Sequence, residues 1–409
     1  MPDAAAMPDP IGALPPRQLR IFDAAVRTGA AGAAARALGL SQPAVTHALH
    51  RLETRLGRRL LERGPGGTRP TKAGRILHRR AVRLAAQLAA ALAATRGDAR
   101  AGQRAAEALT APQLRCHLAI AAQGGFAAAA RALGLSLPAV QRAARGLEQL
   151  AGVALYRRQL REIGVTPAGA ELARRLRVAL TELDQARAEL AVAEGQGGGR
   201  VTAGCLPLMP KPLLARACGA ALRLHPGLRI ALIEDAYDPL LRALRGGEID
   251  VLIGALRPDG PADIAEVPLF DDPYVVVARA RHPLTGSARL GLDALAPFGW
   301  VAAPSGTPRR AALERLFAGR DPARVVLETN STTTMLAMLQ ESDALSVTAR
   351  SLAAAAPLAV LPLPVPADGR RVGQITRADW LPTAEQAGFV ACLRSAVGAV
   401  PEPPVMAAP

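Results

Sequence analysis

The feature that most constrains this chain of 409 residues is a stretch that occurs twice. Residues 33–57 read AAARALGLSQPAVTHALHRLETRLG, and residues 128–152 read AAARALGLSLPAVQRAARGLEQLAG. An offset of 95 positions, from Ala33 to Ala128, aligns the copies without a gap from about Leu14 to about Ala94 of the first. A fixed offset of this kind indicates a tandem duplication of one unit of about 80 residues.

Each copy carries the pattern of three helices with a tight turn before the third. In the first copy a helix is predicted over about 17–27, and a second over about 32–38 ends at Gly39, a residue suited to the positive φ of a C-cap. Ser41 is a natural N-cap for the third helix, whose first turn tolerates Pro43. The buried face of that helix is predicted from the spacing i, i+4, i+7 of Val45, Leu49 and Leu52.

The opposite face of the third helix is polar and free to meet base edges or phosphates. It carries Gln42, Thr46, His47 and His50, of which the two histidines are also readable as merely solvated positions. Residues 60–70 are rich in Gly, Pro and Arg, which predicts a β-hairpin lying along phosphates. An apolar period from 71 to about 95 then predicts a long linker helix.

The basic excess lies almost wholly in the duplicated half. Residues 1–195 hold 29 Lys+Arg against 14 Asp+Glu, whereas residues 196–409 hold 21 against 20. A general Arg-rich bias would raise both halves, so the neutral second half argues against that explanation. The sequence therefore predicts a polyanionic partner for the first half.

The string S-Q-P-A-V-T-x-x-L-x-x-L-E-x-x-L-G from Ser41, followed by L-L-x-R and T-x-A-G, resembles the winged helix-turn-helix of LysR-type transcriptional regulators. The resemblance implies double-stranded DNA as a partner. It covers the whole first copy, and a more diverged version covers the second. The candidate DNA-binding residues are Ser41, Gln42, Pro43, Thr46, His47, His50, Arg51, Arg63, Arg69, Ser136, Gln141, Arg142, Arg145 and Arg158.

The second copy is a departure, since LysR-type proteins usually have one such domain. It replaces Gln42 by Leu137 and Thr46 by Gln141, so the first copy is favoured as the sequence reader. The second copy either reads DNA itself or serves mainly in packing through its own linker helix, predicted over 166–194. In a LysR-like protein this helix pairs antiparallel with a partner chain, which implies a homodimer or homotetramer, although its apolar stripe can also pack on its own domain.

The second half alternates strands and helices, which predicts an α/β fold with ligands at the carboxyl ends of strands. Two lobes joined by two crossings resemble the periplasmic-binding-protein-like effector domain of LysR regulators. Residues 204–282 are most similar to regulators of sugar uptake and aromatic-acid catabolism. Strands are expected at 201–206, 229–236, 249–256, 273–280, 299–304, 324–329, 344–349 and 370–377, and helices at 207–225, 237–245, from 308, from 332 and at 384–397.

The predicted fold class is therefore multidomain: two mainly α winged helix-turn-helix domains with linker helices, then an α/β two-lobed effector domain. We expect a disordered leader at 1–13, the first DNA-binding domain at 14–98, the second at 109–195 and the effector domain at 200–402. Within the last, lobe 1 spans about 200–275 and 371–400, and lobe 2 about 276–370.

The effector is expected between the lobes, where strand ends and helix starts suit a carboxylate or sugar-like ligand. Thr307 is equally an ordinary N-cap of the following helix. The candidate effector-binding residues are Cys205, Leu206, Ser305, Thr307, Thr332 and Thr333.

Other functional classes receive little support from the sequence. It carries no phosphate-binding glycine loop, nucleophile elbow or metal-ligand spacing, so we expect no enzyme activity, no cofactor and no metal. Four scattered cysteines fit reduced thiols in the cytoplasm, and no apolar run suggests a membrane span or secretory signal. Two alternatives stay open: a DNA-architectural protein with a vestigial ligand domain, and a ligand-binding protein without a regulatory role.

Overall fold

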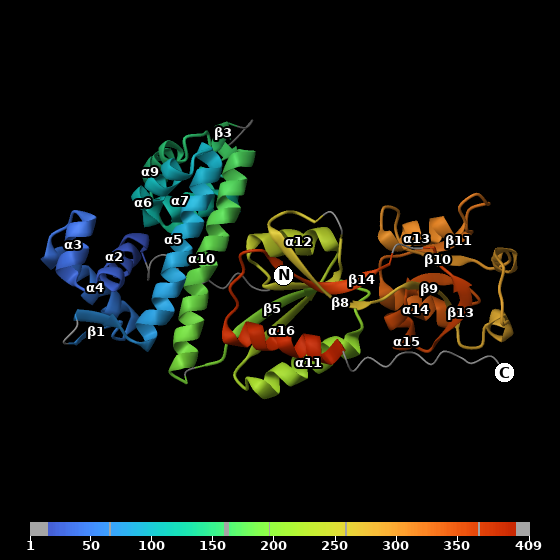
Figure 1. The fold of residues 1–409 in the computed structure, drawn as a ribbon. Helices are drawn as coiled ribbons and strands as arrows, with labels where there is room; N and C mark the ends of the chain where they lie inside the picture. The colour runs from blue at the N-terminus through green and yellow to red at the C-terminus, as the bar shows by residue number, and fades with distance from the viewer. Residues whose placement is uncertain are drawn as a thin grey trace. The chain divides into compact units, whose positions relative to one another are not determined.

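The computed structural model describes residues 15–64, 67–158, 163–195, 197–257, 260–366 and 369–397, so the expected leader lies outside the described part. The chain divides into two compact units between Gly198 and Gly199 (Figure 1). None of the helices in the described ranges is long and apolar enough to cross a membrane.

The first unit opens with a module of three helices and a hairpin, the first module. Its elements are α2 (Pro16–Thr28), α3 (Ala31–Leu38), α4 (Gln42–Leu56), β1 (Leu61–Gly64) and β2 (Gly67–Pro70). Gly39 ends α3 with φ of 62°, and the Ser41 hydroxyl accepts a hydrogen bond from the Ala44 N–H at 3.4 Å, so the tight turn forms as predicted. Phe22, Val45 and Leu52 are fully buried.

The second module repeats this element order. It consists of α7 (Ala111–Gln123), α8 (Phe126–Leu133), α9 (Leu137–Ala151), β3 (Tyr156–Arg158) and β4 (Ile163–Val165). Gly134 has φ of 64°, and Ser136 caps α9 by accepting from the Ala139 N–H at 3.4 Å. The same residues therefore build the same turn in both copies.

Two long helices follow the modules, α5 (Lys72–Arg96) after the first and α10 (Pro167–Ala193) after the second. Their apolar faces belong to one hydrophobic cluster, so α10 packs on α5 of its own chain. A helix that the sequence did not predict, α6 (Ala99–Ala108), joins α5 to the second module. The alanine-rich sequence of α6 has no wide apolar stripe from which a helix could be predicted. The side chain of Asp98 caps the N-terminus of this helix.

The second unit begins with a five-stranded sheet of order β6-β5-β7-β14-β8. The strands β5 (Arg200–Cys205), β6 (Arg229–Glu234) and β7 (Val251–Ala255) are parallel, whereas β14 (Arg371–Arg377) runs antiparallel to both of its neighbours, β7 and β8 (Ile264–Asp271). The helices α11 (Lys211–Leu224) and α16 (Ala384–Val397) pack together on one hydrophobic core with this sheet, and α12 (Tyr237–Gly246) packs in another. The helix predicted from residue 207 begins only at Lys211, because 207–209 form a turn.

A second lobe is built around β9 (Tyr274–Arg279), which pairs with β12 (Ser346–Ala349) and β13 (Leu358–Pro364). Beside it lie the parallel pair β10 (Trp300–Ala302) and β11 (Val325–Glu328) and the helices α13 (Pro308–Leu316), α14 (Thr332–Gln340) and α15 (Arg350–Ala354). The chain enters this lobe after β8 and leaves it before β14, which gives the two predicted crossings. The strands β8 and β13, both interrupted by prolines, were not expected from the sequence.

Candidate DNA-binding face and effector cleft

The outer face of α4 gathers the polar residues predicted for it. Gln42, Pro43, Thr46, His47 and His50 line one shallow depression, and all five are exposed. Arg51 is exposed as well. The Ser41 hydroxyl is occupied by the helix cap, so this residue positions the face of α4. These side chains can meet a ligand without any rearrangement of the core.

The hairpin of the first module is fixed against the turn between α2 and α3. The Thr68 N–H donates to the Gly29 carbonyl at 2.7 Å, and Gly67 has φ of 102° where a Cβ atom would meet the same carbonyl at 2.7 Å. Only glycine satisfies both conditions, so the hairpin approaches the helices closely. Arg69 is exposed on β2, while the Arg63 side chain lies outside the described part.

A half-buried glutamate ties the hairpin to the third helix in each module. A carboxylate oxygen of Glu53 accepts from the N–H groups of Leu60 and Leu61 at 2.8 and 3.1 Å. Glu148 does the same for Leu155 and Tyr156 at 2.9 and 3.2 Å. Each carboxylate thereby satisfies two backbone donors and fixes the angle between helix and hairpin.

The face of α9 differs from that of α4. Arg142 and Arg145 are exposed, whereas Gln141 is half-buried and the Ser136 hydroxyl caps the helix. Leu137 is 40% exposed on this face. The Arg158 side chain lies outside the described part. The second module thus offers two cations and an apolar side chain where the first offers amide, hydroxyl and imidazole groups.

The second unit contains a cleft of about 660 Å³, lined by residues of both lobes. Three predicted effector-binding residues line it: Leu206, Thr307 and Thr332. The other three do not: Cys205 is buried in the core of the first lobe, and Ser305 and Thr333 are exposed beside the cleft. The Thr307 hydroxyl caps α13 by accepting from the Arg310 N–H at 3.2 Å, so its own donor bonds the Pro304 carbonyl.

Arg309 lines the cleft from the first turn of α13 and is only 7% exposed. Its guanidinium contacts the Met335 Sδ at 2.9 Å and donates to the Thr329 carbonyl at 3.1 Å. Among the described residues no carboxylate pairs with it, and burial lowers the pKa of Arg309. A cation in the first turn of a helix is disfavoured by the helix dipole, so a bound anion would stabilise Arg309 in this position.

Arg370 lines the cleft where the chain returns to the first lobe and is 8% exposed. Its Nη1 donates to Asp272 Oδ2 at 2.5 Å, whereas its buried Nε has no hydrogen-bond partner among the described residues. Its guanidinium lies 5.6 Å from the ring centre of Tyr274. One donor of this clamped cation is thus left for a ligand.

Tyr237, at the start of α12, adds a second such group. Its hydroxyl is buried with no hydrogen-bond partner in the described part, and burial raises the pKa of Tyr237. The Arg257 guanidinium stacks on the Tyr237 ring at 3.6 Å from its centre. The cleft therefore combines aromatic walls, cations and an unsatisfied hydroxyl, as small-molecule sites commonly do.

Tyr237, Arg309 and Arg370 are not among the effector-binding residues predicted from the sequence. The first was read as a helix start and the last as a strand start. A signal was present for Arg309, because a basic residue directly after Thr307 and Pro308 falls in the first helical turn, where cations are unfavourable.

Known protein families match both the part of the chain that carries the two modules and the part that carries the cleft. Residues 16–75 and 112–170 each match the family profile described as bacterial regulatory helix-turn-helix protein, lysR family. Residues 194–398 match the profile described as LysR substrate binding domain. The last profile alone spans half of the chain.

Individual relatives agree with the profiles. The chain is 31% identical over 387 residues to the HTH-type transcriptional regulator GalR of Pseudomonas putida, covering 93% of this chain and 96% of that protein. It is 35% identical over 178 residues to a probable hydrogen peroxide-inducible genes activator of Mycobacterium xenopi, covering 43% of this chain and 93% of that one. The structure of a full-length OxyR variant from Pseudomonas aeruginosa superposes with a TM-score of 0.51 at 24% identity, over 73% of this chain and 98% of that chain, which shows a shared fold.

The similarity to GalR is not confined to one module or to the cleft, because it extends over nearly the whole chain. It is also consistent with the subgroup resemblance noted for residues 204–282. The chain therefore belongs to the LysR family and is a DNA-binding transcriptional regulator controlled by a small-molecule effector.

Proposed function

We propose that this regulator contacts double-stranded DNA through two winged helix-turn-helix modules in tandem. In each, the third helix (α4 or α9) enters the major groove and the hairpin follows the phosphates. The observation that carries this is the exposed polar or basic face of each third helix, held at a fixed angle to its hairpin by Glu53 or Glu148. The first module carries more of the base readout, since amide and hydroxyl groups read base edges and arginines contact mainly phosphates.

We further propose that the effector is a small anion carrying hydroxyl groups. Arg309 offers a buried cation without a carboxylate partner among the described residues, Arg370 offers its Nε, and Tyr237 its hydroxyl. Thr307 and Thr332 lie at the N-termini of α13 and α14, where backbone N–H groups favour negative charge. A carboxylate, including a sugar acid, fits these donors better than a neutral sugar. Cys205, Ser305 and Thr333 are not part of this proposed contact set.

The proposed domain plan keeps DNA-binding domains at 14–98 and 109–195 and a periplasmic-binding-protein-like effector domain at 200–402. The helix α6 connects the first two. We propose that the protein acts in the cytoplasm as an oligomer, with the cleft closing on its ligand and changing the DNA geometry that the modules impose.

Effector binding is tested by calorimetric titration of the full chain with sugar acids and aromatic carboxylates. Arg309→Met should weaken the affinity of a carboxylate that binds the wild type by at least tenfold, because a charge-assisted hydrogen bond is lost. The adjacent Arg310 pairs with Glu314 and Glu328, so Arg310→Met is a matched control with little expected change. Equal loss in both variants, or in neither, contradicts a role for Arg309.

DNA recognition is tested by selecting duplexes from a random library with the full chain. One enriched sequence motif is expected, and its binding should weaken steeply with salt, as multiple phosphate contacts require. A library that stays random after several rounds contradicts sequence-specific recognition.

A further inference from the structure

The seam between α5 and α10 is formed by equivalent positions of the two copies. In α5 the buried residues Leu77, Ala81, Leu84, Leu88 and Ala91 are spaced alternately by four and three. Adding the repeat offset of 95 gives Leu172, Leu176, Ala179, Leu183 and Ala186 of α10, all in the same cluster. This spacing is that of a coiled-coil seam, in which each helix covers the other.

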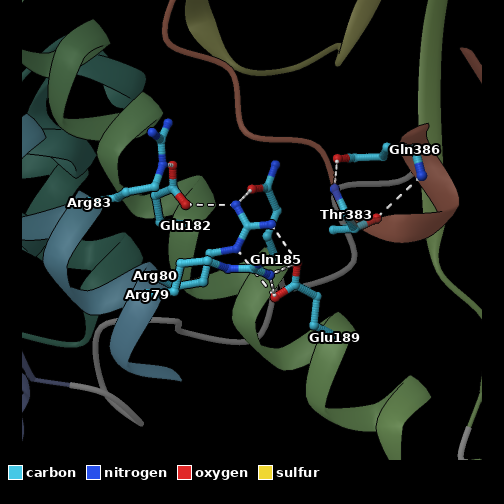
Figure 2. Close-up of polar contacts among 8 residues, drawn as sticks. All are labelled: Arg79, Arg80, Arg83, Glu182, Gln185, Glu189, Thr383 and Gln386. Carbon is cyan, nitrogen blue, oxygen red and sulfur yellow. Dashed lines mark hydrogen bonds and ion pairs between the residues drawn. The ribbon is translucent and has the colours of Figure 1, made fainter. Parts of the chain in front are cut away.

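The two helices run antiparallel. Arg79 Nη2, early in α5, pairs with Glu189, late in α10, at 2.8 Å. Arg83 Nε, one turn further along α5, pairs with Glu182 at 2.8 Å. Figure 2 shows the three arginines of α5 facing Glu182, Gln185 and Glu189 of α10. Contacts that lie further along α5 in the sequence therefore lie earlier in α10, as expected for antiparallel helices.

Each long helix also ends against the other module. Glu194, directly after α10, pairs with Arg58, two residues after the end of α4, at 2.9 Å. At the end of α5, the Thr95 hydroxyl donates to the Ala151 carbonyl at 2.9 Å and Arg96 to the Leu150 carbonyl at 2.8 Å, both in α9. The long helix of each module thus contacts the other module at its end, as the helices of two subunits in a symmetric dimer would.

The polar contacts make this pairing selective for unlike helices. Arg80 is fully buried and pairs with Glu182 at 2.8 Å and Glu189 at 2.6 Å. Burial alone would lower the pKa of Arg80, but the hydrogen bonds that Arg80 donates to Glu189 and Glu182 hold its pKa above the ordinary value. Breaking such a buried pair on one side leaves an uncompensated charge.

The counterparts at the repeat offset lack this network. Glu182 corresponds to Gln87 and Glu189 to Ala94, so two α5 helices paired with the same geometry would leave Arg80 facing no carboxylate. Arg175, the counterpart of Arg80, instead pairs with Glu171 of its own helix at 2.8 Å. Two paired α10 helices would leave the apolar face of α5 uncovered. Only the unlike pair satisfies both helices.

The connector between the copies is itself packed. In α6, a Cβ atom on Gly102 would meet the backbone of Ala93 at 2.5 Å, so the connector lies directly on α5. Arg20 of α2 donates to the Glu107 carbonyl of α6. A short connector docked on α5 therefore keeps the second module close to the first.

We propose that α5 and α10 close on each other within one chain, so that a single chain brings two unlike third helices, α4 and α9, to one DNA site. The chain thereby supplies the complete pair of DNA-binding modules that two identical chains would otherwise provide. The DNA part of this inference rests on the proposed function of the modules, whereas the closed seam does not.

The seam is tested by cross-linking, without DNA. The full chain carrying Arg79→Cys and Glu189→Cys is treated with a short bismaleimide and digested, and a second preparation co-expresses the two single variants under different tags. We expect joined peptides containing positions 79 and 189 in the double variant and at least tenfold fewer in the co-expressed singles. Joined peptides between differently tagged chains at comparable yield overturn the proposal. The wild type, with its native cysteines, gives the background.

A second pair, Thr95→Cys with Leu150→Cys, joins the end of α5 to α9 of the second module and keeps the test decisive if the first pair does not fold. The internally cross-linked chain is then titrated with a duplex selected by the wild type. We expect its affinity to stay within twofold of the uncross-linked chain, whereas a loss above tenfold overturns closure as the DNA-binding form. A failed selection with an intact internal cross-link would contradict the proposed DNA recognition and leave the seam standing.

Discussion

The two modules share a scaffold and differ on the surface that meets the ligand. In both, a glycine packs at the start of the long helix: a Cβ atom on Gly74 or Gly169 would meet the Leu60 or Leu155 carbonyl at 2.0 or 2.3 Å. The serine caps of the third helices and the glutamates that bond the hairpins, Glu53 and Glu148, are present in both copies as well. Positions that hold the backbone were therefore retained in both copies.

The exposed positions have instead diverged. The pair Gln42 and Thr46 becomes Leu137 and Gln141, while the helix carrying them keeps its ends. Core positions differ too, among them Phe22 of the first module, which corresponds to His117 of the second. The comparison teaches that one scaffold presents two chemistries, and each prediction below tests one side of it.

The largest difference is expected between Arg80 and its counterpart Arg175. Arg80→Ala should destabilise the α5–α10 pair by about 3–5 kcal/mol, because it leaves Glu182 and Glu189 short of a buried partner. Arg175→Ala removes only an intrahelical pair with Glu171 and should cost about 0.5 kcal/mol or less. Hydrogen exchange of peptides from 72–96 and 167–193 measures both changes. Similar losses in the two variants would show that the network is not selective.

The second expected effect is an acid sensitivity confined to the second module. His117 is fully buried between the Tyr156 hydroxyl at 2.8 Å and the Gly169 carbonyl at 3.0 Å, and burial lowers its pKa to about 4. In the unfolded chain His117 binds a proton below its ordinary pKa of about 6.5. In the folded module His117 stays neutral until the pH falls to about 4. Stability is therefore present at neutral pH and is lost as the pH falls through this window, by about 2 kcal/mol between pH 7 and pH 5.

His117→Phe copies the first module and should remove this loss. Hydrogen exchange of peptides from 111–165 at both pH values measures it, after correction for the intrinsic exchange rates. Peptides from 16–70 serve as the internal control, since Phe22 occupies the equivalent position. An unchanged acid response in the variant would place the sensitivity elsewhere.

The smallest expected effect concerns specificity. Changing Leu137→Gln and Gln141→Thr gives α9 two of the side chains of α4, so the base preference of the second half-site should move toward the first by about 1 kcal/mol. Competition between selected duplexes measures the shift. Arg157→Ala, on the hairpin of the same module, is the control, because an exposed arginine there should weaken all sequences alike. A uniform loss in the double variant would mean that α9 does not read bases.

Local features of this fold could be predicted from the sequence, and its long-range pairings could not. The turn from Gly39 to Ser41 and most strands followed from residue types at short spacing. The packing partner of α10 could not be predicted in this way. The apolar stripes of α10 and α5 have the same period, and this period fits a helix of a second chain equally well. The cleft residues Tyr237, Arg309 and Arg370 are far apart in the chain, and only the two crossings between lobes bring them together.

The most direct test of the account is a footprint of the full chain on its selected duplex. We compare the wild type with Thr46→Ala/His47→Ala and with Gln141→Ala/Arg142→Ala. The account predicts two protected half-sites of unlike sequence, with each double variant losing protection of a different half. Loss of both halves in the first variant and of neither in the second would contradict it, because α4 helices from two chains would then read the site.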